Sequence, residues 1–349
     1  MNESMAEVRM LAINLAKDVF QLAGENDRFE ILFEARLKSR QAFRDFLYTL
    51  KAPVVVLMET GPGAPAWARE LRGRGIDVRV LPAQRVEEHR SGAKNDCSDC
   101  LAILLAGRDR SIHPVPVKSV ECLAIQASHR VRSGYLSRRT SISNQIRGLL
   151  TEHGVVFGRG DAALARGLDR VLEDVTQPIP DCLRELRAEL LAEHDMLCQR
   201  MEKLDAERSR IAKQEPLSRR LMTVPDVGPI IATALLCKEI DPTQFPNARM
   251  FAAYFGVVPD QRSGGNRVCT TGMSKRGDGY IRSLLINGAH SALQRVDAKS
   301  DGPHPARLHR WEERLGKRSA AVRLANRNLR IMYALMKNGG SYHDQAATP

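Results

Sequence analysis

Three acidic residues in the first third of the chain have the types and spacing for metal-dependent chemistry. Glu59 ends an apolar run (residues 54–58), and Asp96 and Asp99, three residues apart, fall on one face of a helix predicted to continue through Leu105. Phosphodiester chemistry uses two divalent cations about 4 Å apart, and clustered carboxylates are their preferred ligands. The acids therefore predict a site for phosphodiester chemistry, with a solvated acidic surface as the alternative.

Ser263 is the candidate nucleophile. It follows Arg262 and precedes Gly264 and Gly265, so we expect its hydroxyl on an exposed, flexible loop. Positive charge beside a serine suits attack on phosphate, because it stabilises the pentavalent transition state. The neighbouring sequence has no histidine to support a hydrolase triad. An ordinary surface loop is the alternative.

Two other motifs fit their chemistry poorly. Residues 61–66 match the spacing of a dinucleotide-binding fingerprint, but Pro62 and Pro65 remove N–H donors that a pyrophosphate needs. Cys97 and Cys100 form a CxxC pair without a second pair at zinc-ligand spacing, which favours small buried thiols.

The composition excludes several classes of protein. The chain has 349 residues, enough for two or three domains, and its 43% hydrophobic and 27% charged residues exclude wholesale disorder. It has no apolar run of membrane-spanning length, and its start lacks a signal-peptide pattern. Its seven scattered cysteines argue against a disulfide framework. We expect a soluble cytoplasmic protein.

Positive charge is concentrated near the C-terminus. Residues 261–340 hold 16 Lys and Arg against 5 Asp and Glu, which is +11 of the chain's net +12. Such a segment on a nearly neutral body predicts a nucleic-acid binder, with a solubilising surface as the alternative. The candidate contacts, including those of a central basic helix, are Arg130, Arg138, Arg139, Arg147, Arg262, Arg267, Lys275, Arg276, Arg323 and Arg327.

The elements that would position the acids have a recognisable order. Short apolar runs predict three strands, followed by a helix, a strand, a helix and a strand, at residues 8–13, 19–23, 29–35, 39–50, 54–58, 65–72 and 78–81. This is the order of the RNase H-like fold, in which the fourth strand lies parallel to the first and beside it. Asn14, at the end of the first strand, would then lie next to Glu59.

The rest of the chain is predicted to be helical. Apolar spacing predicts a helix over residues 120–150, and a heptad pattern at 183, 190, 197, 204 and 211 predicts a coiled coil, between chains or against that helix. An ordinary amphipathic helix within one domain is the alternative. Residues 224–229 resemble the turn of a helix-hairpin-helix element, although Asp226 stands where glycine is usual. The tail after Gly339 is expected to be disordered.

Several ordered strings carry a family resemblance. They are Ile13-Asn14-Leu15-Ala16-Lys17, Met58-Glu59-Thr60-Gly61, Lys94-Asn95-Asp96-Cys97-Ser98-Asp99, Asn144-Gln145-Ile146-Arg147-Gly148-Leu149-Leu150, Pro225-Asp226-Val227-Gly228, Arg262-Ser263-Gly264-Gly265 and Ser274-Lys275-Arg276-Gly277-Asp278. They resemble the DEDD transposases of the insertion-sequence one-hundred-ten family, in its eleven-eleven subgroup, over about residues 8–338. The resemblance implies an α/β RuvC-like (RNase H-like) domain at 1–115 and a helical coiled-coil region for RNA binding and oligomerisation at 116–214. It further implies an all-α transposase domain with a catalytic serine at 215–340, followed by the tail at 341–349.

The resemblance also implies a role for each motif residue. Glu59, Asp96 and Asp99 correspond to three of the four acids that bind Mg²⁺ (or Mn²⁺), and Ser263 corresponds to the serine. Asn14 takes the place of the first acid, so the site loses a charge and a hard oxygen ligand. A natural variant with weakened metal binding and an inactivating change from Asp both explain the amide.

Family members recombine donor and target DNA as dimers or tetramers, guided by a structured non-coding RNA. The resemblance thus implies a bacterial, nucleoid-associated recombinase in which Ser263 forms a phosphoserine link to DNA. The acids would hold the metals at the same phosphate, from another subunit. A junction-resolving nuclease that uses water, with Ser263 only binding, is the main alternative. An inactive nucleic-acid-binding relative is another.

Overall fold

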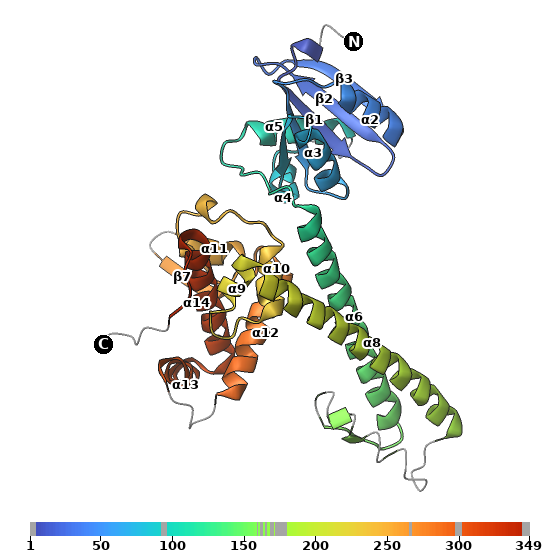
Figure 1. Cartoon of the computed structure of the whole chain (residues 1–349), viewed down its shortest axis with the longest axis vertical. Helices are drawn as coiled ribbons and strands as arrows, with labels where there is room; N and C mark the ends of the chain where they lie inside the picture. Colours follow the sequence, from blue (N-terminus) through green and yellow to red (C-terminus); the bar gives the residue numbers. More distant parts are fainter. Residues whose placement is uncertain are drawn as a thin grey trace. The chain divides into compact units, whose positions relative to one another are not determined.

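The computed structural model describes residues 5–91, 96–158, 160, 163–164, 166–167, 171, 180–264, 267–296 and 302–343. Within these ranges, the structure describes only the backbone of residues 96–97, 181–184, 186–187, 262–264 and 267–271. The chain divides into two compact units, Met1–Ser119 and Val120–Pro349 (Figure 1). In the part that the structure describes, no helix is both long and apolar enough to cross a bilayer.

The first unit contains a five-stranded mixed sheet. Its strands are β1 (Met10–Leu15), β2 (Phe20–Glu25), β3 (Ile31–Leu37), β4 (Val55–Glu59) and β5 (Asp77–Leu81), in the spatial order β3-β2-β1-β4-β5. Strands β1 to β3 form an antiparallel meander, whereas β4 is parallel to β1 and β5 is parallel to β4. This order confirms the predicted RNase H-like arrangement, including the fourth strand beside the first.

Helices cover both faces of this sheet (Figure 1). They are α2 (Arg40–Thr49), α3 (Ala64–Arg72), α4 (Ala83–Glu87) and α5 (Asp96–Arg108). Strand side chains alternate between the faces: Ile13 packs in the core with Phe43 of α2 and Trp67 of α3, whereas Ala12 packs with Ile103 of α5. The same alternation places Asn14, two residues after Ala12, on the α5 face.

The second unit begins with a long helical hairpin. α6 (Val120–Thr151) and α8 (Asp181–Gln214) pack side by side and antiparallel (Figure 1). Ile146 on α6 and Leu197 on α8 are buried in the core that the two helices share. Met201 on α8 is also buried. The heptad seam therefore faces the preceding helix of its own chain. A coiled coil between chains stays a prediction.

The hairpin leads into a helical bundle. Its helices are α9 (Pro216–Leu221), α10 (Pro229–Leu236), the short 3₁₀ helix η1 (Pro242–Gln244), α11 (Ala248–Tyr254), α12 (Gly279–Arg295), α13 (Pro303–Leu315) and α14 (Lys317–Asn338). Leu324, Leu329 and Met332 of α14 are fully buried in the core that these helices share.

The expectation of an all-α C-terminal region is wrong. Two antiparallel strands, β6 (Pro259–Gly264) and β7 (Arg267–Met273), form a hairpin in which Ser263 pairs with Val268. Ser263 therefore lies in a strand and not in the flexible loop expected from its glycines. Val268 and the threonines at 270 and 271 favour extended backbone, while the intervening Gly265 and Asn266, outside the described residues, are typical turn formers.

Two smaller expectations have mixed outcomes. Asp226, between α9 and α10, has a φ of +66°, the left-handed backbone that glycine adopts most easily, but a helix-hairpin-helix element stays a prediction. Tyr342 lies in the tail that was expected to be disordered. Its N–H donates to Thr223 Oγ1 at 2.8 Å, and Arg327 donates to its hydroxyl at 2.7 Å. The expectation of disorder is therefore wrong for this part of the tail, while residues 344–349 lie outside the described residues.

Candidate active site and nucleic-acid surface

The carboxyl ends of β1 and β4 bring two predicted site residues together. Ile13 is opposite Met58 in the parallel ladder, so Asn14 and Glu59 are the next residues on neighbouring strands. Two positions earlier on the same strands, Ala12 and Leu57 lie in the core that faces α5, and Asn14 and Glu59 are both partly exposed. Polar groups at the adjacent carboxyl ends of parallel strands are a common basis for ligand sites in α/β folds.

Helix α5 contributes the third residue, Asp99. It is only 8% exposed. Asn14 Nδ2 donates to Asp99 Oδ2 at 3.4 Å, which ties the end of β1 to α5. The predicted convergence of Asn14 and Asp99, 85 residues apart in sequence, is therefore present in the fold.

An arginine that the sequence did not suggest lies against this carboxylate. Arg90 Nε is 2.7 Å from Asp99 Oδ1, and the two side chains are 18% and 12% exposed. The two atoms are not aligned as a hydrogen bond, and within the described residues neither has another hydrogen-bond partner. Asp99 Oδ1 is thus a buried acceptor held by charge alone.

The remaining N-terminal site residues are only partly described. Asp96 is the first residue of α5, one turn before Asp99, but its side chain and that of Cys97 lie outside the described set. Cys100 is buried against the sheet, as expected of a structural thiol. Among the described residues, no group of three His, Cys, Asp or Glu side chains forms a metal site.

The donor set nevertheless suits a hard divalent cation. Asp99 Oδ1 is a buried oxygen without a hydrogen-bond donor of suitable geometry among the described residues, and a cation would satisfy it. Glu59 adds a carboxylate and Asn14 an amide oxygen from the neighbouring strand ends. An amide carries no charge, so Asn14 would bind a cation more weakly than a carboxylate.

Close backbone packing fixes the base of the β6–β7 hairpin. Gly256 and Gly277 have φ angles of +68° and +79°, and an added Cβ would lie 2.0 Å from Arg276 O and 1.9 Å from Tyr254 O, respectively. Lys275 N donates to Gly256 O at 3.2 Å. The backbone after β7 therefore lies directly against the end of α11, and only glycine fits at both crossings.

Asp278 anchors the same turn. Its Oδ1 caps α12 by accepting from the N–H groups of Tyr280 and Ile281, and its Oδ2 pairs with Lys238. Burial raises the pKa of Asp278. The hydrogen bond from the Lys238 ammonium and those from the two N–H groups lower it by more, so the pKa lies below its usual 3.8. The predicted basic residues Lys275 and Arg276 are exposed on this fixed turn.

A buried polar cluster joins the helical hairpin to the bundle. Arg132 on α6 forks onto Asp205 on α8, with Nε–Oδ1 and Nη2–Oδ2 distances of 2.5 and 2.9 Å. Arg208, fully buried, also contacts Asp205, with Nη1 at 3.5 Å from Oδ1, and donates to the backbone oxygen and the hydroxyl of Ser128. Arg208 interrupts the heptad pattern because it belongs to this cluster.

His129 completes the cluster. Its Nδ1 is 2.9 Å from the Tyr280 hydroxyl on α12, and its Nε2 is 3.0 Å from Thr233 Oγ1 on α10. Burial, together with the positive charges of Arg208 and Arg132, lowers the pKa of His129 to about 4. The imidazole is therefore neutral at pH 7 and holds α6, α10 and α12 together.

The predicted nucleic-acid contacts fall into three groups. Arg130 and Arg138 are exposed on α6, Arg323 is exposed on α14, and Arg139 is half-buried. Arg147 instead donates to the backbone oxygens of Gly158 and Gly160, at 2.8 and 2.7 Å, which holds the segment after α6. The side chains of Ser263, Arg262 and Arg267 lie outside the described set.

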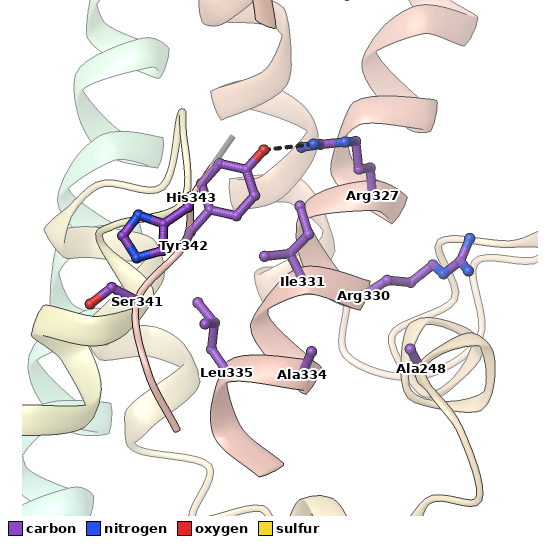
Figure 2. A pocket seen from close by; sticks show the side chains of 9 residues that line it. All are labelled: Ala248, Arg327, Arg330, Ile331, Ala334, Leu335, Ser341, Tyr342 and His343. Atoms are coloured by element: carbon purple, nitrogen blue, oxygen red, sulfur yellow. Dashed lines mark hydrogen bonds between the residues drawn. The ribbon is translucent and has the colours of Figure 1, made fainter. Parts of the chain in front are cut away.

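A cavity of about 520 Å³ lies beside α14. Figure 2 shows Arg327 hydrogen-bonded to Tyr342 on one side and Arg330 near Ala248 on the other, with Ile331 among the apolar residues between them. A basic and aromatic surface of this kind suits nucleic acid. The sequence marked Arg327, but it did not suggest Tyr342.

Comparison with known proteins gives matches over both units. Residues 13–155 match a family described as DEDD transposase, and residues 218–304 match the transposase IS116/IS110/IS902 family. The chain is 37% identical to a probable family 20 transposase of Pseudomonas aeruginosa, over 95% of this chain and 98% of that protein. It is 34% identical to the transposase for insertion sequence element IS1111A of Coxiella burnetii, over 97% and 92%. With the transposase for insertion sequence element IS1328 of Yersinia enterocolitica, it shares 31% identity over 96% and 98%.

Proposed function

Because the chain belongs to the IS116/IS110/IS902 family of DNA transposases, we propose that it inserts and excises an insertion sequence as an RNA-guided recombinase acting through a phosphoserine intermediate. The observation that carries the proposal is the meeting of Asn14, Glu59 and Asp99 at one edge of an RNase H-like sheet. The substrates would be donor and target DNA on the bacterial nucleoid, with pairing supplied by a non-coding guide RNA.

The chemistry follows from two groups of residues. Ser263 Oγ would attack a DNA phosphorus, so that an Oγ–P bond forms while one P–O bond to deoxyribose breaks. The serine proton is lost to solvent or a nearby base, and the departing sugar oxygen takes up a proton. Rejoining reverses these steps on a new sugar hydroxyl, so no net hydrolysis is needed.

The acidic residues would act on the same phosphate. Asp99 and Glu59, with Asp96, would hold Mg²⁺ or Mn²⁺, which stabilises the charge of the phosphoryl transition state. Exposed arginines and lysines on the turn after β7, on α6 and on α14 would bind the nucleic acid backbones. The helical hairpin α6–α8 offers a surface for guide RNA and for a second copy.

A covalent-adduct assay tests the proposed reaction. Protein, guide RNA, DNA and Mg²⁺ are incubated, and denaturing gels are searched for a protein–DNA adduct. We expect an adduct that Ser263→Ala abolishes and that Ser283→Ala, an exposed serine of α12, leaves unchanged. Cleaved ends without an adduct would identify the water-dependent nuclease, and binding without cleavage would identify an inactive relative.

Mixing two inactive variants tests whether the site is shared between copies. Asp99→Ala and Ser263→Ala proteins are each inactive in the proposed scheme. If one copy supplies the serine and another the acids, a mixture recovers adduct formation, whereas sites built within one copy recover none. Size measurement of the assembled complex distinguishes a dimer from a tetramer.

A further inference from the structure

The acidic site carries an unusual balance of charge. Glu59 and Asp99 supply two formal negative charges, Asn14 supplies none, and Arg90 adds a positive charge in direct contact with Asp99; the proposed function adds Asp96 as a third negative charge. The net formal charge of this set is therefore −2. One divalent cation neutralises it, whereas two would leave an excess of two positive charges.

The geometry of Arg90 argues for a role beyond an ordinary ion pair. Its Nε lies 2.7 Å from a carboxylate oxygen that is buried and has no aligned hydrogen bond among the described residues. A guanidinium is permanently charged and cannot lose a proton to relieve its burial. Arg90 therefore occupies one side of Asp99 as a fixed cation, while Asn14 occupies the other oxygen at 3.4 Å.

Two cations about 4 Å apart repel each other strongly and need bridging carboxylates between them. The residue at the end of β1, Asn14, which contacts Asp99, is an amide and adds no negative charge between two cations. The amide and the guanidinium are thus two independent obstacles to a second cation at the same site.

Resting on the proposed function, we infer that this site binds one divalent cation and that the Arg90 guanidinium supplies the second positive charge at the scissile phosphate. The terminal nitrogens of a guanidinium suit this role, because they pair with phosphate oxygens in a fixed planar geometry. Arg90 is then a positioning residue for Asp99 and, with DNA bound, a contact to the phosphate.

Titration of the full-length protein with Mn²⁺, in the absence of DNA, tests the inference by calorimetry and by electron paramagnetic resonance of free Mn²⁺. We expect one Mn²⁺ per chain in the wild type. Removing a neighbouring positive charge by Arg90→Ala tightens binding by about tenfold, since one charge at this distance is worth at least ~1 kcal/mol. The double variant Asn14→Asp/Arg90→Ala binds two Mn²⁺.

Control variants separate this effect from a general change in charge or folding. Arg85→Ala removes a partly exposed arginine of α4 that pairs with Glu88, and it leaves Mn²⁺ affinity unchanged. Arg90→Lys keeps the charge and retains one Mn²⁺ per chain, which provides the test if Arg90→Ala fails to fold. Two Mn²⁺ in the wild type, no binding at millimolar Mn²⁺, or unchanged affinity in a folded Arg90→Ala would each overturn the inference. None of these readouts depends on Ser263 or on an adduct, so this inference and the proposed function fail separately.

Discussion

The molecule contains two arginine–aspartate contacts, one buried and one half-buried, that differ in their hydrogen bonds. In the second unit, Arg132 grips Asp205 through two aligned bonds, and Arg208 donates to Ser128 on the neighbouring helix. In the first unit, Arg90 touches Asp99 at 2.7 Å without alignment, and Asp99 Oδ1 has no aligned donor within the described residues. The same two residue types therefore hold helices together in the second unit and leave a carboxylate oxygen able to bind a ligand in the first.

This difference shows how to separate structural from chemical charge. A buried ion pair that also satisfies its hydrogen bonds fixes geometry, and its loss leaves an uncompensated charge inside the fold. A buried carboxylate with an unused acceptor gains from a ligand that can fill it. Charge alone does not distinguish Asp99 from Asp205, but hydrogen-bond geometry does, and the side chain of Asp99 is also the more buried, at 12% exposed against 34%.

Breaking the structural contact has the largest expected effect. Asp205→Asn removes the charge between Arg132 and fully buried Arg208, and we expect the free energy of unfolding to fall by about 3–5 kcal/mol. Urea denaturation followed by circular dichroism measures this loss. Asp195→Asn, whose side chain is 73% exposed on the same helix, should change stability by less than about 0.5 kcal/mol. Equal losses in the two variants would contradict the structural role of Asp205.

Breaking the contact in the first unit should affect chemistry instead. Asp99→Asn should slow adduct formation by at least ~10²-fold, about 3 kcal/mol in activation free energy, because even outer partners of metal ligands are worth 10–100-fold. We expect its free energy of unfolding to change by less than about 1 kcal/mol, since losing one negative charge relieves repulsion among the clustered acids. Initial rates on denaturing gels and urea denaturation check the two parts. A large loss of stability with normal chemistry would place Asp99 in the same class as Asp205.

The contrast also explains what the sequence could predict. The sheet order and the pairing of Asn14 with Glu59 follow from apolar periodicity and connection rules, so both were predictable. Arg90 was not, because its contact with Asp99 depends on how the chain turns after α4. The role of Arg208 was not predictable either, since its partners Ser128 and Asp205 come from two helices whose relative register no local pattern specifies.

The β6–β7 hairpin was missed for a different reason. Glycine next to Ser263 indicated a loop, and residues 259–264 have no alternation of apolar and polar side chains that would have predicted a strand, yet they pair with residues 267–273. Strand pairing between short segments depends on packing against the rest of the fold, which a propensity argument does not include. The sequence therefore identified Ser263 as a candidate nucleophile, but it did not predict that this residue lies in a strand.

Acidification probes the structural cluster through His129. The pKa of about 4 in the folded protein lies below the usual 6.5, so the unfolded chain takes up a proton first as the pH falls. The stability present above pH 6.5 is therefore lost progressively down to about pH 4, by about 2–3 kcal/mol. His129→Gln retains hydrogen-bonding groups but does not titrate, so its unfolding free energy should vary less over this pH range. If the unfolding free energy of the two proteins changed with pH in the same way, His129 would not be the cause of the acid sensitivity.

The exposed arginines of α14 provide a contrast with the two ion pairs. We expect them to affect the binding of nucleic acid without affecting stability. Arg330, at the cavity beside Tyr342, is exposed, and Arg330→Ala should weaken DNA binding by about threefold to tenfold, under ~1.4 kcal/mol. Each lost phosphate contact should also reduce the slope of log affinity against log salt by about 1. Fluorescence anisotropy at several salt concentrations measures both quantities. Arg210→Ala, which removes an exposed arginine of α8 already paired with Glu207, is the matched control and should leave the slope unchanged. If the two variants reduced the slope equally, binding would depend on total charge, and the concentration of positive charge in residues 261–340 would have no specific role.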